Sequence, residues 1–298
     1  MLTSSVLFLI SKNMRKLFLL FLLIPACLPA QTATEFNYSS SYSTGSSFIQ
    51  TLGIARGLVP GVSVVHKFGR NEAVGTTTEP VSLTGVYQTP TVLTSIEIVS
   101  GSADDTAAGS GAQKVFIQGL STDWELTSEI VTMNGTTAVA LTNQYFRLFR
   151  AYVYESGTYA TATAPSHAGV ITIRTAGAGA SWLVINDVSV FAKGQSQCAV
   201  YTVPSGYTAY ISGIDIHVEA TKPATIFLFK REGADIVTSP YSAMRLVKEW
   251  DGLDGSSNYS ESAPLGPFPE KTDIGFMARV EQGSARVAVD FELLLVQN

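Results

Sequence analysis

Charged side chains are scarce in this 298-residue chain: they make up 14% of it, against roughly 25% in an average soluble protein. The formal net charge is only −5, so the sequence gives no support for nucleic-acid binding, which needs a clustered basic face. Ser, Thr and Gly take the place of charge, which favours short strands and many turns over long surface helices. A surface with so little charge also predicts that neighbouring subunits cover part of it.

Cysteine is almost absent, which excludes a disulfide framework and a zinc cluster. The two cysteines are Cys27 and Cys198, and Cys27 lies in a segment expected to be removed. One remaining cysteine cannot form either kind of site. Cys198 stands in a strand-like run, so we expect a buried, unreactive thiol there.

No apolar run is long enough to favour a membrane-spanning helix. The segment from Met14 has the parts of a secretory signal peptide: a basic start, an apolar run over 17–24 and a small-residue exit near Ala30. We therefore predict a leader over 1–30, no membrane association of the mature chain, and a Ser/Thr-rich linker or arm over 31–48. If the leader is used, the chain is secreted or held at the cell surface. The alternative is that translation starts downstream, at Met14 or beyond.

Apolar and polar residues alternate with a period of two through most of the remaining chain. In the run 114–118 (KVFIQ), Val115 and Ile117 alternate with Lys114, Phe116 and Gln118. The turn signal Asn134-Gly135 follows another alternating run. This pattern predicts an all-β protein of two β-sandwich or jelly-roll-like domains, over 49–193 and 194–298. The only helix candidate spans 242–250, and the proline-rich segment 264–269 is expected to form a loop.

Candidate catalytic and metal-binding residues are few. Asp104-Asp105 could contribute to a calcium site, but a solvated turn explains the pair better. Asp215 and Glu219 share one strand face with His217, which could support glycoside hydrolysis, although an exposed sheet face gives the same pattern. The three histidines stand in unrelated local contexts. We therefore predict no catalytic residue, no bound metal and no cofactor.

Arginine and aromatic residues interleave between positions 145 and 152. Such residues are favoured at protein interfaces, so Arg147, Phe149, Arg150 and Tyr152 are the candidate interface residues. The edge of a core would explain the same pattern.

From about Gln50 onward the chain resembles virion structural proteins of tailed bacteriophages, especially marine ones. The resemblance is collinear and covers most of the chain. It is carried by the segments 55–57 (ARG), 66–71 (HKFGRN), 105–112 (DTAAGSGA), 134–139 (NGTTAV), 147–150 (RLFR), 156–160 (SGTYA), 243–245 (AMR), 273–277 (DIGFM) and 289–292 (VDFE). The resemblance implies a virion component and supplies no catalytic residues. The leader departs from the family, because virion proteins assemble in the cytoplasm and need no export.

Together these features predict a non-enzymatic structural subunit of a viral particle, located in the virion. It would be a capsid decoration, tail-associated or fibre-like component whose partners are its own copies and other virion proteins, with no nucleic acid bound. The alternative is a secreted adhesin or carbohydrate-binding module that uses exposed aromatics such as Trp124, Trp182 or Trp250. A third possibility is a glycosidase-like enzyme on the same scaffold.

Overall fold

The computed structural model describes residues 52–84, 86–161, 164–186 and 194–298. The chain divides into two compact units, residues 1–58 and 59–298. The described part of the first unit contains a short helical stretch at 52–55. The predicted leader and the predicted Ser/Thr-rich arm lie outside the described residues.

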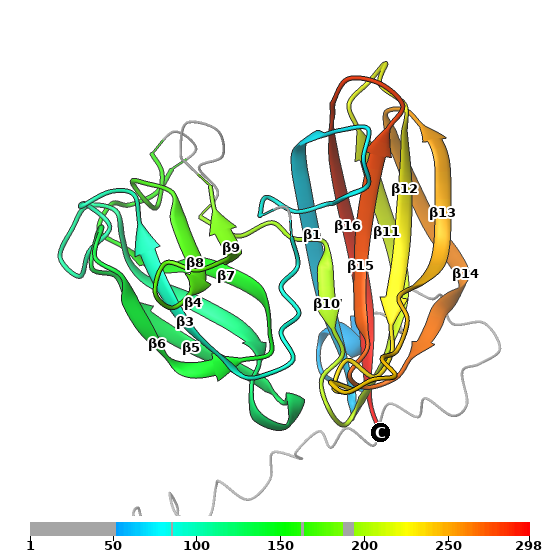
Figure 1. Ribbon diagram of the computed structural model, residues 1–298, viewed down its shortest axis with the longest axis horizontal. Helices are drawn as coiled ribbons and strands as arrows, with labels where there is room; N and C mark the ends of the chain where they lie inside the picture. The colour runs from blue at the N-terminus through cyan, green and yellow to red at the C-terminus, as the bar shows by residue number, and fades with distance from the viewer. Residues whose placement is uncertain (1–51, 85, 162–163, 187–193) are drawn as a thin grey trace, which may run out of the picture. The chain divides into compact units, whose positions relative to one another are not determined.

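The terminal sandwich of the second unit is built from strands near both ends of the chain (Figure 1). One sheet has the order β1-β16-β11-β14 and the other β10-β15-β12-β13, with β2 also paired to β15. All these pairings are antiparallel. Eight strands in this order form a jelly roll, the double Greek-key sandwich. Its strands are β1 (Val62–Val74), β2 (Glu79–Pro80), β10 (Val200–Thr202), β11 (Tyr207–Val218), β12 (Ala224–Arg231), β13 (Arg245–Leu253), β14 (Ser256–Phe268), β15 (Asp273–Val280) and β16 (Ala285–Gln297).

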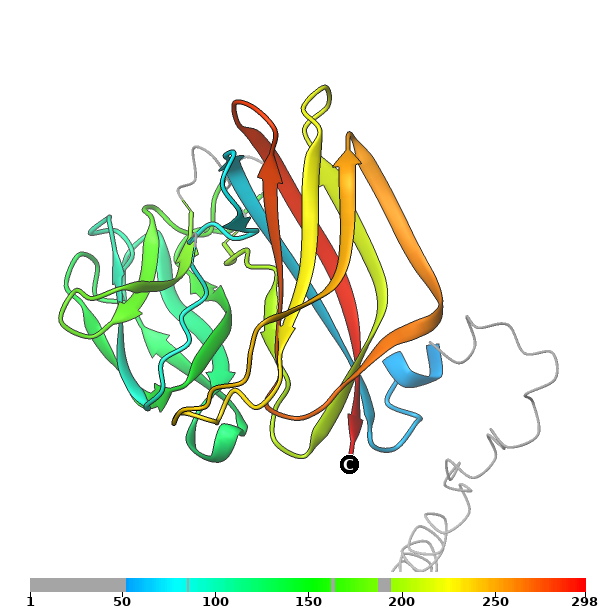
Figure 2. The same ribbon diagram turned by 45° about the vertical axis from the view of Figure 1, so that its right-hand side comes forward.

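The mid-chain sandwich is formed by the strands between β2 and β10 (Figure 2). Its sheets have the orders β6-β3-β8-β9 and β5-β4-β7. The strands are β3 (Thr94–Ser100), β4 (Ala112–Leu120), β5 (Leu126–Thr132), β6 (Val139–Tyr145), β7 (Arg147–Ser156), β8 (Ile171–Thr175) and β9 (Ser181–Ile185), with a 3₁₀ turn, η2 (Thr122–Trp124), before β5. The Asn134-Gly135 turn therefore connects strands of two different sheets.

The mid-chain sandwich is an insertion into the jelly roll, and its two ends leave and re-enter side by side. The amide of Leu83 donates to the carbonyl of Gln197 (3.1 Å), and the amide of Ala199 donates to that of Val81 (3.0 Å). Neighbouring ends are what allow one domain to be inserted into another. This pairing differs from the predicted boundaries: β1 and β2 lie within 49–193 but pair with β16 and β15 of the later half.

The all-β prediction is confirmed, because alternation produces the buried faces of both sandwiches. In β16 every second residue from Ala285 to Leu295 is buried, and in β11 the buried Ile214, Ile216 and Val218 alternate with more exposed polar residues. One apolar core lies between the jelly-roll sheets and another between the sheets of the mid-chain sandwich. Period-two burial on one face is expected for strands that cover a core.

Two local predictions are wrong. The helix candidate at 242–250 is instead the loop before β13 and most of β13 itself. The segment 264–269 was expected to be a loop, but β14 runs through it to Phe268. Because β14 ends its sheet and its pairing with β11 is interrupted by two register shifts, Pro264 and Pro267 occupy an edge strand, where proline is tolerated.

Candidate functional site

A buried ionic cluster joins the two sandwiches. Arg147, at the start of β7, is 1% exposed, and its Nε and Nη2 donate to the carboxylate oxygens of Asp273 at 2.9 and 3.1 Å. Asp273 begins β15 and also accepts from Thr202 Oγ1 (2.6 Å) and Arg231 Nη2 (2.5 Å). The guanidinium of Arg147 lies 5.0 Å from the ring of Trp124. A bidentate arginine–carboxylate pair fixes geometry as well as charge. This cluster therefore orients the mid-chain sandwich, which carries Arg147, relative to the jelly roll, which carries Asp273.

The four predicted interface residues take different positions. Arg147 and Phe149 are both 1% exposed, so they serve a contact within the chain and are not available to a partner subunit. Arg150 donates from Nη2 to the carbonyl of His66 (2.6 Å), which also links the two sandwiches. Tyr152 stacks on Phe116 with ring centroids 4.7 Å apart. For Arg150 and Tyr152, which are partly exposed, contact with a partner stays a prediction.

The tryptophans do not form a sugar-binding platform. Trp124, Trp182 and Trp250 are 5%, 3% and 6% exposed. Trp124 stacks on Phe146 at 4.6 Å, and Trp182 donates from Nε1 to Thr175 Oγ1 (2.9 Å). The expectation that these residues are exposed aromatics is therefore wrong, and it was the basis of the carbohydrate-binding alternative.

The sequence predicted a solvated turn at Asp105, and this prediction is wrong: the carboxylate is fully buried. It accepts hydrogen bonds from the amides of Ala112 (2.7 Å), Ala168 (2.8 Å) and Gly169 (2.9 Å) and from Ser100 Oγ (2.5 Å). A Cβ at Gly111 would collide with Asp105 Oδ1, which explains the glycine in that turn. Asp105 thus closes the loop between β3 and β4, in which it lies, and ties that loop to residues 168–169 before β8; its oxygens are used by the chain itself.

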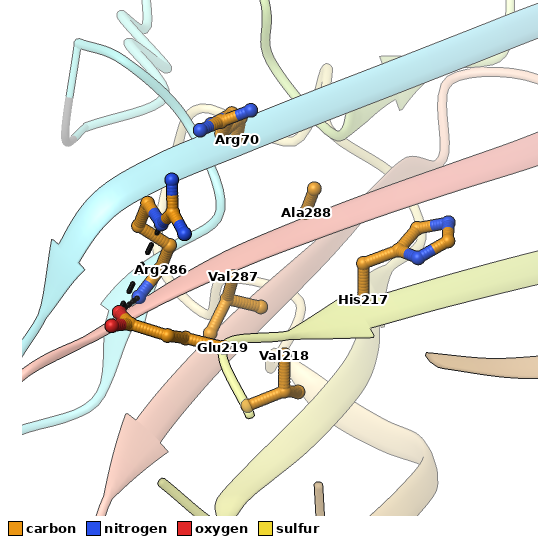
Figure 3. A pocket seen from close by; sticks show the side chains of 7 residues that line it. All are labelled: Arg70, His217, Val218, Glu219, Arg286, Val287 and Ala288. Carbon is orange, nitrogen blue, oxygen red and sulfur yellow. Dashed lines mark hydrogen bonds and ion pairs between the residues drawn. The ribbon is translucent and has the colours of Figure 1, made fainter. Parts of the chain in front are cut away.

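A hollow of about 220 Å³ lies on the outer face of the β1-β16-β11 sheet, lined by Arg70, His217, Val218, Glu219, Arg286, Val287 and Ala288 (Figure 3). The amide of Arg286 donates to Glu219 (3.2 Å) and lowers the pKa of that carboxyl, as does Lys222. Glu219 is therefore ionised at neutral pH and is not a proton donor. The backbone positions of Asp215 and Glu219 are roughly 13 Å apart along the extended chain, wider than the carboxyl separation of about 5–9.5 Å that glycosidases use.

The same face brings together charged residues that the sequence did not connect. Asp290 of β16 lies directly opposite Asp215 of β11. Burial raises the pKa of Asp290; His66 and His217 act in the opposite direction, and Asp215 adds to the rise. Like charges directly opposite each other destabilise a sheet. The pairing of β1 and β11 on either side of β16 is what places the two histidines near one carboxylate.

An exposed apolar segment, the β12–β13 arm (residues 233–246), connects β12 to β13. Ile236, Val237, Tyr241, Met244 and Leu246 are 47%, 38%, 64%, 55% and 56% exposed. β13 forms the end of its sheet, so one side of its backbone is an open edge. Long loops without regular structure are uncommon in compact domains and are often functional, and clustered exposed apolar side chains mark interaction sites. Sequence reasoning missed the arm: the helix candidate at 242–250 covered only its last residues, and no feature was assigned to 233–241.

Within the described ranges, no group of three or more His, Cys, Asp and Glu side chains is placed to hold a metal ion. The same ranges contain no helix with the length and apolar character needed to cross a bilayer.

No protein-family model and no curated protein matches the chain. Solved structures with some similarity include infectious bursal disease virus strain Gx, at 11% identity over 80% of this chain and 73% of that chain, with a TM-score of 0.22. T=1 particles derived from infectious bursal virus match at 13% identity over 80% of this chain and 74% of that chain, with a TM-score of 0.19. A VP2 subviral particle of infectious bursal disease virus matches at 12% identity over 79% of this chain and 76% of that chain, also with a TM-score of 0.19. Likenesses at these TM-scores carry no argument about this chain.

Proposed function

We propose that this chain is a non-enzymatic structural subunit of a viral particle that acts by assembling with copies of itself and with other virion proteins. The observation that carries the proposal is the exposed apolar β12–β13 arm beside the open edge of a jelly roll. The sequence resemblance to virion structural proteins supports the viral setting. More specifically, we propose that the chain is a capsid decoration, tail-associated or fibre-like component of the particle.

Jelly rolls are used by viral capsid proteins and also by lectins and cupins, so the fold alone does not select a function. The way in which the insertion is held supports an assembly role. The insertion is fixed to the jelly roll by the Arg147–Asp273 pair and by the backbone hydrogen bonds between segments 81–83 and 197–199. A subunit with its two sandwiches held together in this way presents fixed surfaces to its neighbours, which a regular particle requires.

The arm supplies the contact surface. Its five large apolar side chains are exposed, and an edge strand offers unpaired backbone groups to another chain. Arg245, within the arm, and Glu232, which directly precedes it, form an ion pair at 2.7 Å, so their charges are partly neutralised. We expect a second copy of the chain to cover the apolar side chains, since symmetric self-contacts are the commonest way for soluble proteins to assemble.

Sedimentation velocity over a range of concentrations tests this contact. We expect the purified chain to self-associate and a Met244→Glu/Leu246→Glu variant to be shifted toward monomer. Each buried apolar side chain contributes about 1.5–3 kcal/mol, so the dissociation constant should rise at least about a hundredfold.

The matched control is Leu126→Glu/Ile130→Glu, which changes two exposed apolar residues of β5, an edge strand of the mid-chain sandwich. This variant should associate like the wild type, and circular dichroism should show both variants folded. A wild-type chain that stays monomeric at every concentration, or dissociation by the control and not by the arm variant, would overturn the role of the arm.

A further inference from the structure

A lysine and a cysteine lie side by side in the interior, and the proposed assembly uses neither. Lys67 of β1 is 4% exposed and Cys198 is 3% exposed. The Nζ of Lys67 lies 3.9 Å from Cys198 Sγ, and both groups donate to the carbonyl oxygen of Phe149, the thiol at 3.4 Å. The two residues are 131 positions apart in the chain.

Lys67 is an unusual core residue because, among the residues that the structure describes, its amine has no carboxylate within ion-pair distance. Its amine contacts the Phe149 carbonyl, the Cys198 sulfur and, at 5.6 Å, the ring of Phe149. Burial lowers the pKa of Lys67 to about 8; Cys198 acts to raise it and Arg150 to lower it further. Near that pH a large fraction of the amine is neutral and therefore nucleophilic.

We propose that Lys67 and Cys198 form an oxidation-dependent covalent bridge, a sulfenamide that joins Nζ to Sγ. The oxidant is a peroxide. The Cys198 sulfur attacks hydrogen peroxide, the O–O bond breaks, and sulfenic acid and one water form. The neutral Lys67 amine then attacks this sulfur; the S–O bond breaks, an N–S bond forms, and the hydroxyl leaves with one amine proton as a second water. Sulfur is oxidised by two electrons and peroxide is reduced by two.

The geometry favours the bridge over further oxidation. Sulfenic acids condense with nearby nitrogen nucleophiles, and the Lys67 amine is already next to the sulfur. A second peroxide molecule would have to reach a site that is closed to solvent and opens only by local fluctuation. The bridge would also remove a buried cation, which is costly in an apolar interior.

The bridge would fasten the first strand of the jelly roll to the segment that returns from the insertion. Cys198 pairs with Ser82 in an isolated bridge where the two ends of the insertion run together. A link between residues far apart in the chain restricts the unfolded state. We therefore expect the oxidised chain to melt at a higher temperature than the reduced chain, and dithiothreitol to reverse the difference.

Peptide mapping of the full-length chain after treatment with hydrogen peroxide tests the proposal. Tryptic cleavage after Lys67 should be lost. A joined peptide containing Lys67 and Cys198 should appear, lighter by two hydrogens than the sum of its parts, and should separate again under dithiothreitol. Bridge formation should accelerate as the pH rises through about 8.

Three variants serve as controls. Cys198→Ser and Lys67→Met should each abolish the joined peptide. Lys114→Met, at a surface lysine paired with Glu155, should leave it unchanged.

The proposal is overturned if the folded wild-type chain carries Cys198 as sulfinic or sulfonic acid while Lys67 is still cleaved normally. It is also overturned if Cys198 remains a thiol after exposed methionines such as Met244 have been oxidised. Both outcomes are read on the wild-type chain, so neither depends on a variant that folds.

Discussion

Replacing Arg147 by methionine should lower the free energy of unfolding by about 3–5 kcal/mol, the cost of breaking a buried ion pair by removing one partner. The substitution leaves the buried Asp273 without the two-pronged contact to Nε and Nη2. Arg231 and Thr202 still contact this carboxylate, which places the expected loss toward the lower end of the range. Urea unfolding at pH 7, followed by tryptophan fluorescence, measures the change.

Lys114→Met provides the control, because Lys114 and Glu155 form a surface pair with side chains 39% and 44% exposed. Such pairs contribute about 0–1 kcal/mol.

The effect of the Arg147 substitution should also depend on pH. Burial alone would raise the pKa of Asp273, but Arg147, Thr202 and Arg231 outweigh it, and the net pKa lies below its ordinary value. A lowered carboxyl pKa stabilises the fold above the unfolded-state pKa, near 3.9 for Asp, and this stability is lost as the pH falls through the folded-state pKa. The difference between wild type and Arg147→Met should therefore shrink below about pH 4. Equal losses for the two variants at pH 7 would contradict the assigned role of the cluster.

Replacing Asp105 by alanine should be comparably damaging, with a loss of at least about 3 kcal/mol, because each buried donor left without an acceptor costs about 1–3 kcal/mol. Three backbone amides and the Ser100 hydroxyl lose their acceptor together. The β3–β4 loop and residues 168–169 should become more mobile, because the carboxylate no longer holds them together. Hydrogen exchange at Ala112, Ala168 and Gly169 should therefore accelerate more than exchange in the jelly roll.

Asp104→Ala is the matched control, since Asp104 is the adjacent residue and is exposed. Surface substitutions of this kind usually change stability by less than about 0.5 kcal/mol. If the two alanine variants were equally stable, Asp105 would not be the anchor of these loops.

Local alternation was sufficient to predict the fold class and several strands. β4, β11 and β16 lie where the period-two pattern placed them, because each covers a core with one face. β5 also lies where it was expected, although Val131 is its only buried residue. The pattern could not predict which strands pair. β1 is matched to β16, with Val62 opposite Val296, and nothing near Val62 in the sequence specifies so distant a partner.

The sites were harder to predict than the strands. The mixture of arginine and aromatic residues around Arg147 did indicate an interface, but composition cannot distinguish a contact within one chain from a contact between chains. Two adjacent aspartates look alike in sequence, yet the fold buries Asp105 and exposes Asp104. The apolar residues of the β12–β13 arm follow no regular spacing, so nothing in the sequence indicated their role, and only the structure shows that they are exposed.

The central claim, that the chain is a structural subunit of a viral particle, is tested most directly by quantitative mass spectrometry of purified virus-sized particles alongside the soluble secreted fraction from the same source. We expect the chain in the particles at many copies, with an N-terminal peptide that begins downstream of the leader. Detection only in the secreted fraction, cut near Ala30, would contradict the claim and favour a secreted adhesin.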